Sequence, residues 1–348
     1  MNPYIMALLL FALGLGTTIT FASSHWLLAW MGLEINTLAI IPIMSQHHHP
    51  RAVEATTKYF LTQATAAATL LFASTTNAWL TGQWDIALMT HPVPTTMIIL
   101  ALSLKVGLAP LHTWLPEVLQ GLDLSTGLIL STWQKLAPFA LMVQMPLHGQ
   151  GLLTVLALAS TLIGGWAGLN QTQLRKILAY SSVAHLGWMV LILQYAPSLT
   201  LLALSLYLVL TSAAFLTLKV NSATTVNSLS ISWAKAPILT AFLPMTLLSL
   251  GGLPPLSGFM PKWLILQELT KQDLPVVATL AALTALLSLY FYLRLSYAMA
   301  LTISPNVVLG TAYWRYPCHQ SLAPVAIATM ASALLLPLLP TLASTLSL

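Results

Sequence analysis

Four ionisable residues stand inside long apolar stretches of this 348-residue chain: Glu34, Lys105, Lys135 and Lys262. A charged side chain at the middle of a membrane costs about 2.5–3.5 kcal/mol on insertion scales. Burial removes water from an ammonium group and makes its deprotonation easier, whereas a nearby carboxylate stabilises the charged form and makes deprotonation harder. A buried lysine with a movable acidic partner can therefore take up and release a proton near neutral pH, without any cofactor.

Two histidines inside apolar stretches, His112 and His185, are candidate relays, because the imidazole group titrates near neutral pH. Simpler interpretations stay open. Each histidine can be a hydrogen-bonded packing residue, and the lysines can form structural ion pairs or extend to the membrane interface. The His run at 47–49 precedes Pro50 without a second group of metal ligands, which favours a solvated loop over a metal site.

The amino-acid composition is that of a membrane protein. Hydrophobic residues make up 57% of the chain and charged residues 5%, whereas a soluble domain carries about 25% charged residues.

The net charge of +5 comes from scattered basic residues, which excludes a nucleic-acid surface. A single cysteine, Cys318, excludes an internal disulfide and a Cys-ligated iron–sulfur cluster. With no dinucleotide or P-loop motif, we expect no cofactor in this chain.

Apolar runs broken by Pro, Gly and polar clusters predict an all-α polytopic membrane protein. We expect one membrane domain, 1–348, with about eleven transmembrane helices near 3–22, 26–44, 57–80, 92–121, 124–143, 149–170, 174–194, 198–218, 237–271, 275–300 and 322–346. This count places Lys271 alone on one side. The N-terminal side receives the other loop-associated basic residues: Arg51, Lys58, Arg175, Lys176, Lys219, Lys235, Arg294 and Arg315. The N-terminus is therefore predicted to face the cytoplasmic-equivalent side.

The first apolar stretch has no Lys or Arg before Arg51. It lacks the basic region of a signal peptide and the Arg-rich character of a transit peptide, so we expect the first helix to be retained. Gly14 and Gly16 lie within this stretch, where small residues predict close packing between helices.

Two segments, 92–121 and 237–271, are longer than one crossing requires and contain interior prolines. Interior prolines break helices, and a break within a membrane survives only where protein or water satisfies the freed backbone groups. We therefore predict two interrupted helices. A simple proline kink is the alternative for either one.

The two interruptions resemble each other. Setting Gly107 against Gly252 aligns GLAPLHTWLPEVL with GLPPLSGFMPKWL, 145 residues apart. Five predicted crossings separate their starts, so the segments should run in opposite directions, as paired interrupted helices do in transporters. We predict inverted pseudo-repeats near 1–143 and 149–300, followed by a C-terminal helix near 322–346. Chance similarity between two Pro- and Gly-rich strings is the alternative.

The stretches LAPLHTWLPEVLQG, RKILAYSSVAHLG and GLPPLSGFMPKWL resemble the antiporter-like membrane subunits of respiratory NADH:ubiquinone oxidoreductase, or Complex I. The start MNP, together with HWLLAWMGLEINTLAIIP and HPRAVEATTKYFLTQATAA, is similar more narrowly to the mitochondrially encoded members in animals. The resemblance extends from the first residue to about Lys271, and the C-terminal part carries little of it.

The resemblance implies a multi-pass, proton-translocating core subunit in the mitochondrial inner membrane, with its N-terminus in the matrix. It implies part of an enzyme, H⁺-translocating NADH:ubiquinone reductase (EC 7.1.1.2), without a redox centre of its own. NAD, FMN, iron–sulfur clusters and ubiquinone would be bound by other subunits. The implied partners are neighbouring membrane-arm subunits, including antiporter-like chains, and lipids such as cardiolipin. The typical family fold has fourteen helices with two inverted five-helix repeats, and the animal members lack the first three.

By the same resemblance, Glu34 pairs with Lys105 on the first interrupted helix, and further family lysines match Lys135 and Lys262. We expect Lys105 and Lys135 to hold the proton centrally, Glu34 to act as the switch, and Lys262 to release the proton on the intermembrane side.

Two other functions stay open. One is a free-standing or Mrp-type cation/proton antiporter, and the other is a structural linker with vestigial charges. Glu34 is the only carboxylate predicted at mid-span, which disfavours a Na⁺ site of hard oxygen ligands.

Overall fold

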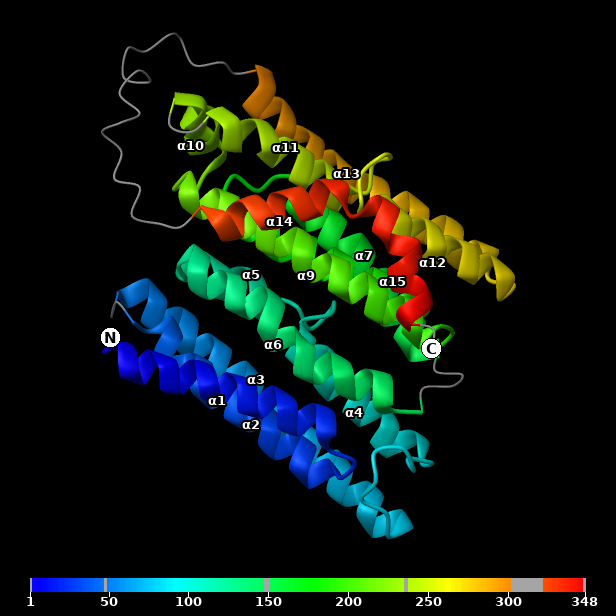
Figure 1. Ribbon diagram of the computed structural model, residues 1–348. Helices are drawn as coiled ribbons and strands as arrows, with labels where there is room; N and C mark the ends of the chain where they lie inside the picture. Colours follow the sequence, from blue (N-terminus) through cyan, green and yellow to red (C-terminus); the bar gives the residue numbers. More distant parts are fainter. Residues whose placement is uncertain (1, 47–48, 147–150, 235–236, 302–321, 347–348) are drawn as a thin grey trace. The chain divides into compact units, whose positions relative to one another are not determined.

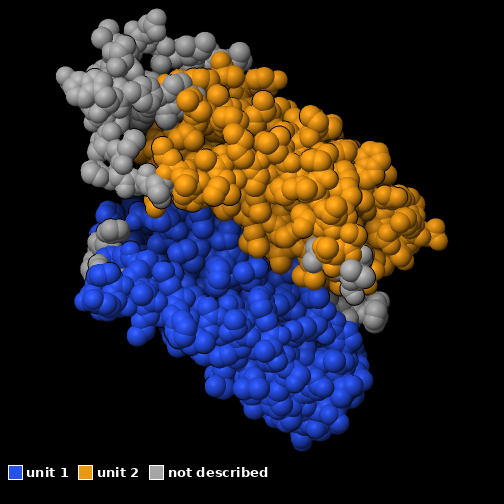
Figure 2. Space-filling model, viewed as in Figure 1, with its two compact units in different colours: residues 1–156 blue, residues 157–348 orange. Residues whose placement is uncertain are grey.

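The computed structural model describes residues 2–46, 49–146, 151–234, 237–301 and 322–346 (Figure 1). Regular structure within these ranges is helical, apart from two isolated β-bridges. The chain divides into two compact units, Met1–Leu156 and Ala157–Leu348 (Figure 2). Some residues used in the sequence predictions lie outside the described ranges: His47, His48, Lys235, Arg315 and Cys318.

The first unit consists of six helices and the start of a seventh. They are α1 (Pro3–Ala22), α2 (Trp26–Met44), α3 (Pro50–Thr81), α4 (Pro92–Val106), α5 (Trp114–Gly121), α6 (Leu124–Gln144) and α7 (Gly151–Gly168), which continues into the second unit. The second unit then contains α8 (Leu174–Ile192), α9 (Pro197–Val220), α10 (Val226–Ser230), η1 (Ile231–Ala234), α11 (Pro237–Gly251), α12 (Phe259–Lys271), α13 (Pro275–Leu301), α14 (Ala323–Leu334), η4 (Leu336–Leu338) and α15 (Leu339–Leu346).

The helical fold class is confirmed, but the number of membrane crossings stays a prediction. Five described helices, α1, α2, α7, α9 and α13, are long and apolar enough to cross a membrane by themselves. The count becomes six if α14 and the helical segment after it form one bent span. The sequence predicted one helix over 322–346, and this prediction is wrong, because the helix axis bends by 67° after Leu334. Pro337 and Pro340 at the bend explain the difference, because proline removes a backbone donor.

Both predicted interruptions are present. The segment 92–121 forms α4 and α5, and the segment 237–271 forms α11 and α12. The first helix of each pair ends at a glycine with positive φ, +88° at Gly107 and +81° at Gly252. A residue without Cβ adopts this left-handed conformation at little cost.

The two breaks have the same local structure at a constant offset. α4 and α11 begin and end 145 residues apart, and so do the starts of α5 and α12. The amides of Gly107 and Leu108 both donate to the Ser103 carbonyl at 2.9 Å. In the second unit, the amides of Gly252 and Leu253 donate to the Leu248 carbonyl at 3.0 and 3.3 Å. Each break also contains a cis X-Pro peptide bond, Ala109–Pro110 and Pro254–Pro255.

A second pattern recurs in the loops. One β-bridge joins His25, before α2, to Asp85, after α3, and the other joins Gln173, before α8, to Thr225, after α9. Each bridge ties the start of one helix to the end of the next through two backbone hydrogen bonds of 2.9–3.1 Å. Apart from the short elements α10 and η1, the order helix, helix, helix, interrupted pair, helix thus occurs twice, in α1–α6 and in α7–α13.

Close helix packing is confirmed at Gly16 but is wrong for Gly14. A Cβ on Gly16 would collide with Asn36 and with the carbonyl of Gly32, so α1 and α2 approach closely there. A Cβ on Gly14 would have no atom within 4 Å. The corresponding contact in the second unit joins α7 to α8, where a Cβ on Gly164 would lie 2.7 Å from the backbone nitrogen of Ala184.

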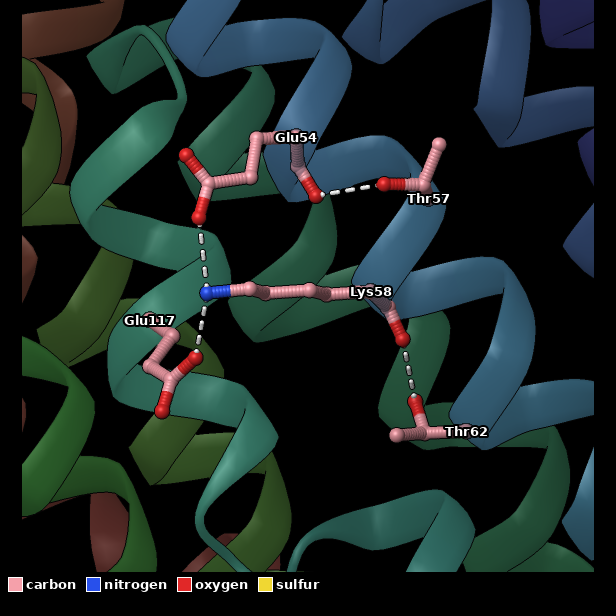
Figure 3. A network of polar contacts seen from close by, with 5 residues as sticks. All are labelled: Glu54, Thr57, Lys58, Thr62 and Glu117. Carbon is pink, nitrogen blue, oxygen red and sulfur yellow. Dashed lines mark hydrogen bonds and ion pairs between the residues drawn. The ribbon is translucent and has the colours of Figure 1, made fainter.

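An ion-pair network fastens α5 to α3 (Figure 3). Lys58 Nζ lies 2.8 Å from Glu117 Oε2 and 2.9 Å from Glu54 Oε1. Lys58 was predicted as a loop residue, whereas it lies in α3, which begins at Pro50. The His49 side chain accepts a hydrogen bond from the Arg51 amide at 3.2 Å. This cap and the proline at the first helical position start the helix earlier than the apolar run predicts.

Replacing Gly107 by Ala should weaken the first break, because a Cβ would meet Leu115 Cδ1 at 2.9 Å. Alanine must also adopt the positive φ of +88°. We expect the free energy of unfolding to fall by about 1–3 kcal/mol, measured by thermal unfolding of the assembled protein in detergent. Gly14→Ala is the matched control, since it introduces a methyl group without contacts. Equal stability of the two variants would contradict the interpretation.

Candidate functional site

The first unit brings together two of the predicted lysines. Lys105 lies in the last turn of α4 and Lys135 in α6, and their side chains are only 6% and 3% exposed. Both line one internal cavity, which has room for a water molecule. Polar side chains from three helices complete its wall: Asn36, Thr37, Tyr59, Gln63 and Gln134.

Several polar atoms around this cavity have no hydrogen-bond partner within the described part of the chain. They are Lys105 Nζ, Gln63 Nε2 and both polar side-chain atoms of Asn36. Gln134, in contrast, donates through Nε2 to the Asn36 carbonyl at 3.3 Å, and its Oε1 accepts from the Tyr59 hydroxyl at 3.5 Å. Since buried polar groups are nearly always hydrogen-bonded, the cavity is suited to binding water.

Glu34 lies on α2 beside these lysine-bearing helices. Its carboxylate exerts a Coulombic attraction on Lys105 and is close enough to interact with Tyr59. Glu34 Oε2 and Lys105 Nζ are both without a hydrogen-bond partner among the described residues. The two groups are therefore close enough to interact electrostatically, but Lys105 Nζ does not donate a hydrogen bond to the carboxylate.

The break after α4 positions these groups. Trp114, the first residue of α5, donates through Nε1 to the Leu104 carbonyl at 3.0 Å and lines the cavity. It also packs edge-on against Tyr59 at 5.7 Å between ring centroids. His112 lies in the break and is buried, but it is not among the residues that line the cavity.

The second unit holds the fourth predicted charge at its own break. Lys262 on α12 donates through Nζ to the Gly251 carbonyl at 2.7 Å and to the Leu250 carbonyl at 3.4 Å. These carbonyls belong to the last turn of α11, the negative end of that helix dipole. The ammonium is thus stabilised by backbone groups that the interruption itself releases.

His185 lies close to this lysine. The two residues line one cavity together with Tyr207. The His185 ring is 5.7 Å from that of Tyr207, and its Nε2 lies 3.5 Å from the Tyr292 hydroxyl. Lys262 also borders a larger, mostly apolar groove, which is lined chiefly by residues of α12 and α13.

The structure thus places four of the predicted residues, Glu34, Lys105, His112 and Lys135, in the first unit, and the other two, His185 and Lys262, in the second. Neutral side chains that the sequence predictions did not include complete both clusters. These are Asn36, Tyr59, Gln63, Gln134, Tyr207 and Tyr292. Amide side chains within apolar segments were the available signal, since such groups are also costly to bury without partners.

The described residues contain no group of three or more His, Cys, Asp or Glu side chains that could hold a metal ion. The polar side chains that line the two cavities carry amine, amide, hydroxyl, indole and imidazole groups, and the Glu34 carboxylate interacts with Lys105. This chemistry suits proton transfer through side chains and water.

Comparisons with known proteins agree with the arrangement. Residues 23–288 match the family model described as NADH:quinone oxidoreductase/Mrp antiporter, TM. Residues 289–343 match the model described as NADH dehydrogenase subunit 2 C-terminus. NADH-ubiquinone oxidoreductase chain 2 of Tetraodon nigroviridis is 73% identical over 98% of each chain. The chain of that name in Oncorhynchus mykiss is 69% identical over 100% of each chain.

Solved structures with the same fold include two large membrane complexes. A chain of respiratory complex I from Thermus thermophilus has a TM-score of 0.78 and 28% identity, covering 96% of this chain and 80% of that chain. A chain of the Mrp complex from Dietzia has a TM-score of 0.84 and 17% identity, covering 97% and 76%. The resemblance derived from the sequence motifs is confirmed. This chain belongs to the NADH:quinone oxidoreductase/Mrp antiporter transmembrane family, and within it to the group of NADH-ubiquinone oxidoreductase chain 2.

Proposed function

We propose that this chain is a proton-translocating membrane-arm subunit of NADH:ubiquinone oxidoreductase. The observation that carries the proposal is the full-length identity of 73% to a chain 2 relative, combined with buried lysines that line a water-sized cavity. The Mrp-type alternative is supported less, because the similarity to the Mrp chain is 17% identity and indicates the fold alone.

The proposed setting follows from the same relatives. The chain is a multi-pass protein of the mitochondrial inner membrane with its N-terminus in the matrix. It contacts neighbouring membrane-arm subunits and lipids, including cardiolipin, and carries no redox centre. Electrons pass through cofactors of other subunits, and this chain contributes groups that hold and move protons.

The repeated breaks support the proposed pair of pseudo-repeats, 1–143 and 149–300. If the chain crosses the membrane eleven times, five crossings separate the two breaks, and the repeats are inverted. Each repeat then presents one interrupted helix with a lysine at or near its broken end, Lys105 in the first and Lys262 in the second. Interrupted helices placed in this way mark ion-transport sites in transporters.

In the proposed mechanism, Glu34 controls the charge on Lys105. When the carboxylate is near, attraction holds a proton on the lysine; when it withdraws, desolvation favours release. Lys135 lines the same cavity and is the proposed acceptor of this proton. His112 and His185 are candidate relays, and Lys262 is the proposed exit residue.

The Glu34→Gln variant tests the switch. The amide keeps the size of the side chain but removes the charge that attracts Lys105. A loss of about 1–2 kcal/mol of attraction lowers a rate about fivefold to thirtyfold. We expect normal assembly with ubiquinone reduction slowed to this extent in sealed membranes that develop a proton gradient. Unchanged reduction and an unchanged ratio of protons to electrons would refute the role of Glu34.

Lys262 is tested by a pair of variants. Lys262→Met removes the charge and the hydrogen bonds to the end of α11, whereas Lys262→Arg keeps a donor and a charge whose proton is never released. If Lys262 carries the proton, both variants lose proton translocation, which is measured as protons moved per electron in vesicles. An arginine variant with normal translocation would mean that Lys262 is a fixed positive charge.

A preparation of the native protein tests the assignment as a whole. We expect it to co-purify with flavin-containing and iron–sulfur subunits, detected by their absorbance and by mass spectrometry. Isolation as a complete cation/proton antiporter without such subunits would favour the Mrp-type function instead.

A further inference from the structure

We infer that Asn36 and Gln63 form a water-binding site that positions proton transfer between Lys105 and Lys135. The inference rests on the proposed function and adds two neutral positioning residues to it. The side chains come from different helices, Asn36 from α2 and Gln63 from α3, and both line the cavity that the two lysines share.

The burial of the two amides supports a bound water molecule. Asn36 is 2% exposed and Gln63 is 4% exposed. Asn36 Nδ2 and Oδ1, Gln63 Nε2 and Lys105 Nζ have no hydrogen-bond partner in the described part of the chain. Unsatisfied buried polar groups destabilise a protein unless water reaches them. The cavity is large enough for one water molecule and offers it the two to four polar partners that it needs.

Two other polar side chains of the cavity already have hydrogen-bond partners in the protein, so Asn36 and Gln63 are the amides available to bind water. Gln134 and Tyr59 bond each other at 3.5 Å, and Gln134 also bonds the Asn36 backbone carbonyl at 3.3 Å. An amide both donates and accepts hydrogen bonds, so Asn36 and Gln63 can fix the orientation of a water molecule. A lysine amine presents only donors when it is charged.

The second unit provides an internal comparison for Asn36. The α1–α2 contact of Gly16 with Asn36 corresponds, 148 residues later, to the α7–α8 contact of Gly164 with Ala184. A methyl group is sufficient for helix packing there. The amide at Asn36 is therefore not required by the fold.

The same comparison applies to α3 and α9. An offset of 148 residues places Tyr59 against Tyr207, both 2% exposed, and Gln63 against Thr211. The Thr211 hydroxyl donates to the Tyr207 carbonyl of its own helix at 2.7 Å. For the interrupted helices the offset is 145 residues, and it places Leu250, at the broken end of α11, against Lys105. The two amides thus occur in the unit that has a lysine before its break, and not in the other.

The water molecule acts without being consumed. The ammonium of one lysine gives a proton to the water oxygen, and the water gives one of its own protons to the neutral amine of the other. One N–H bond breaks and one forms, the water is regenerated, and the positive charge moves between the lysines. Asn36 and Gln63 hold the water oxygen in line between them and remain unchanged.

Gln63→Met tests the site in the assembled complex, because methionine has a similar length but no amide. We expect normal amounts of complex and a coupled ubiquinone reduction rate lowered about threefold to tenfold, the factor for one lost hydrogen bond. The solvent deuterium isotope effect on this rate should increase, since proton transfer becomes slower than the other steps. Asn36→Ala, which copies the residue at Ala184, should give the same two changes.

Thr211→Val is the matched control at the corresponding position, and we expect its rate and isotope effect to equal those of the wild type. A normal rate and isotope effect in assembled Gln63→Met would overturn the inference. If Glu34→Gln is impaired in the same assay while Gln63→Met is normal, this inference alone fails. If both are normal, the proposed function of the cluster fails.

A density map of the wild-type complex at a resolution that shows water gives an independent test. We expect one ordered water within hydrogen-bonding distance of both Asn36 and Gln63. If Gln63→Met does not assemble, this measurement decides the question. A cavity filled by side chains, with no water at the two amides, would overturn the inference.

Discussion

The burial of ammonium groups is the constraint on which the rest of this structure depends. A buried cation is tolerated only where backbone dipoles, polar side chains, water or a carboxylate replace its hydration. The protein uses two solutions. In the first unit, Lys105 and Lys135 share a polar cavity beside Glu34. In the second unit, the partly buried Lys262 donates directly to the carbonyls of Leu250 and Gly251.

The interrupted helices make both solutions possible. An unbroken helix would use its own carbonyls internally, and no lysine could reach them. Gly107 and Gly252 end the first helix of each pair through the same type of hydrogen-bonded turn. The break after α4 also allows Trp114 to donate a hydrogen bond to the end of α4 and to line the cavity. The Lys58–Glu117 contact helps to fasten the short helix α5 to α3.

The sequence was sufficient to predict the helical class and the two interruptions, because apolar length and proline position act locally. It was insufficient for contacts between distant segments. Nothing in the local pattern joins Lys58 to Glu117, which is 59 residues away. The amides of Asn36 and Gln63 carry no charge, and their lack of hydrogen-bond partners is visible only in the folded chain. The bend after α14 shows that apolar length alone does not guarantee a straight helix.

The hydrogen bond from Lys262 to the end of α11 has a mechanical consequence. A charged donor bonds a carbonyl more strongly than a neutral amine does, so each change of protonation also changes the force between α12 and the last turn of α11. Gly252 stands at this joint, with space for a Cβ taken by the lysine side chain itself. Loss of the proton from Lys262 would therefore weaken the attachment of α12 to the last turn of α11, and its return would restore that attachment.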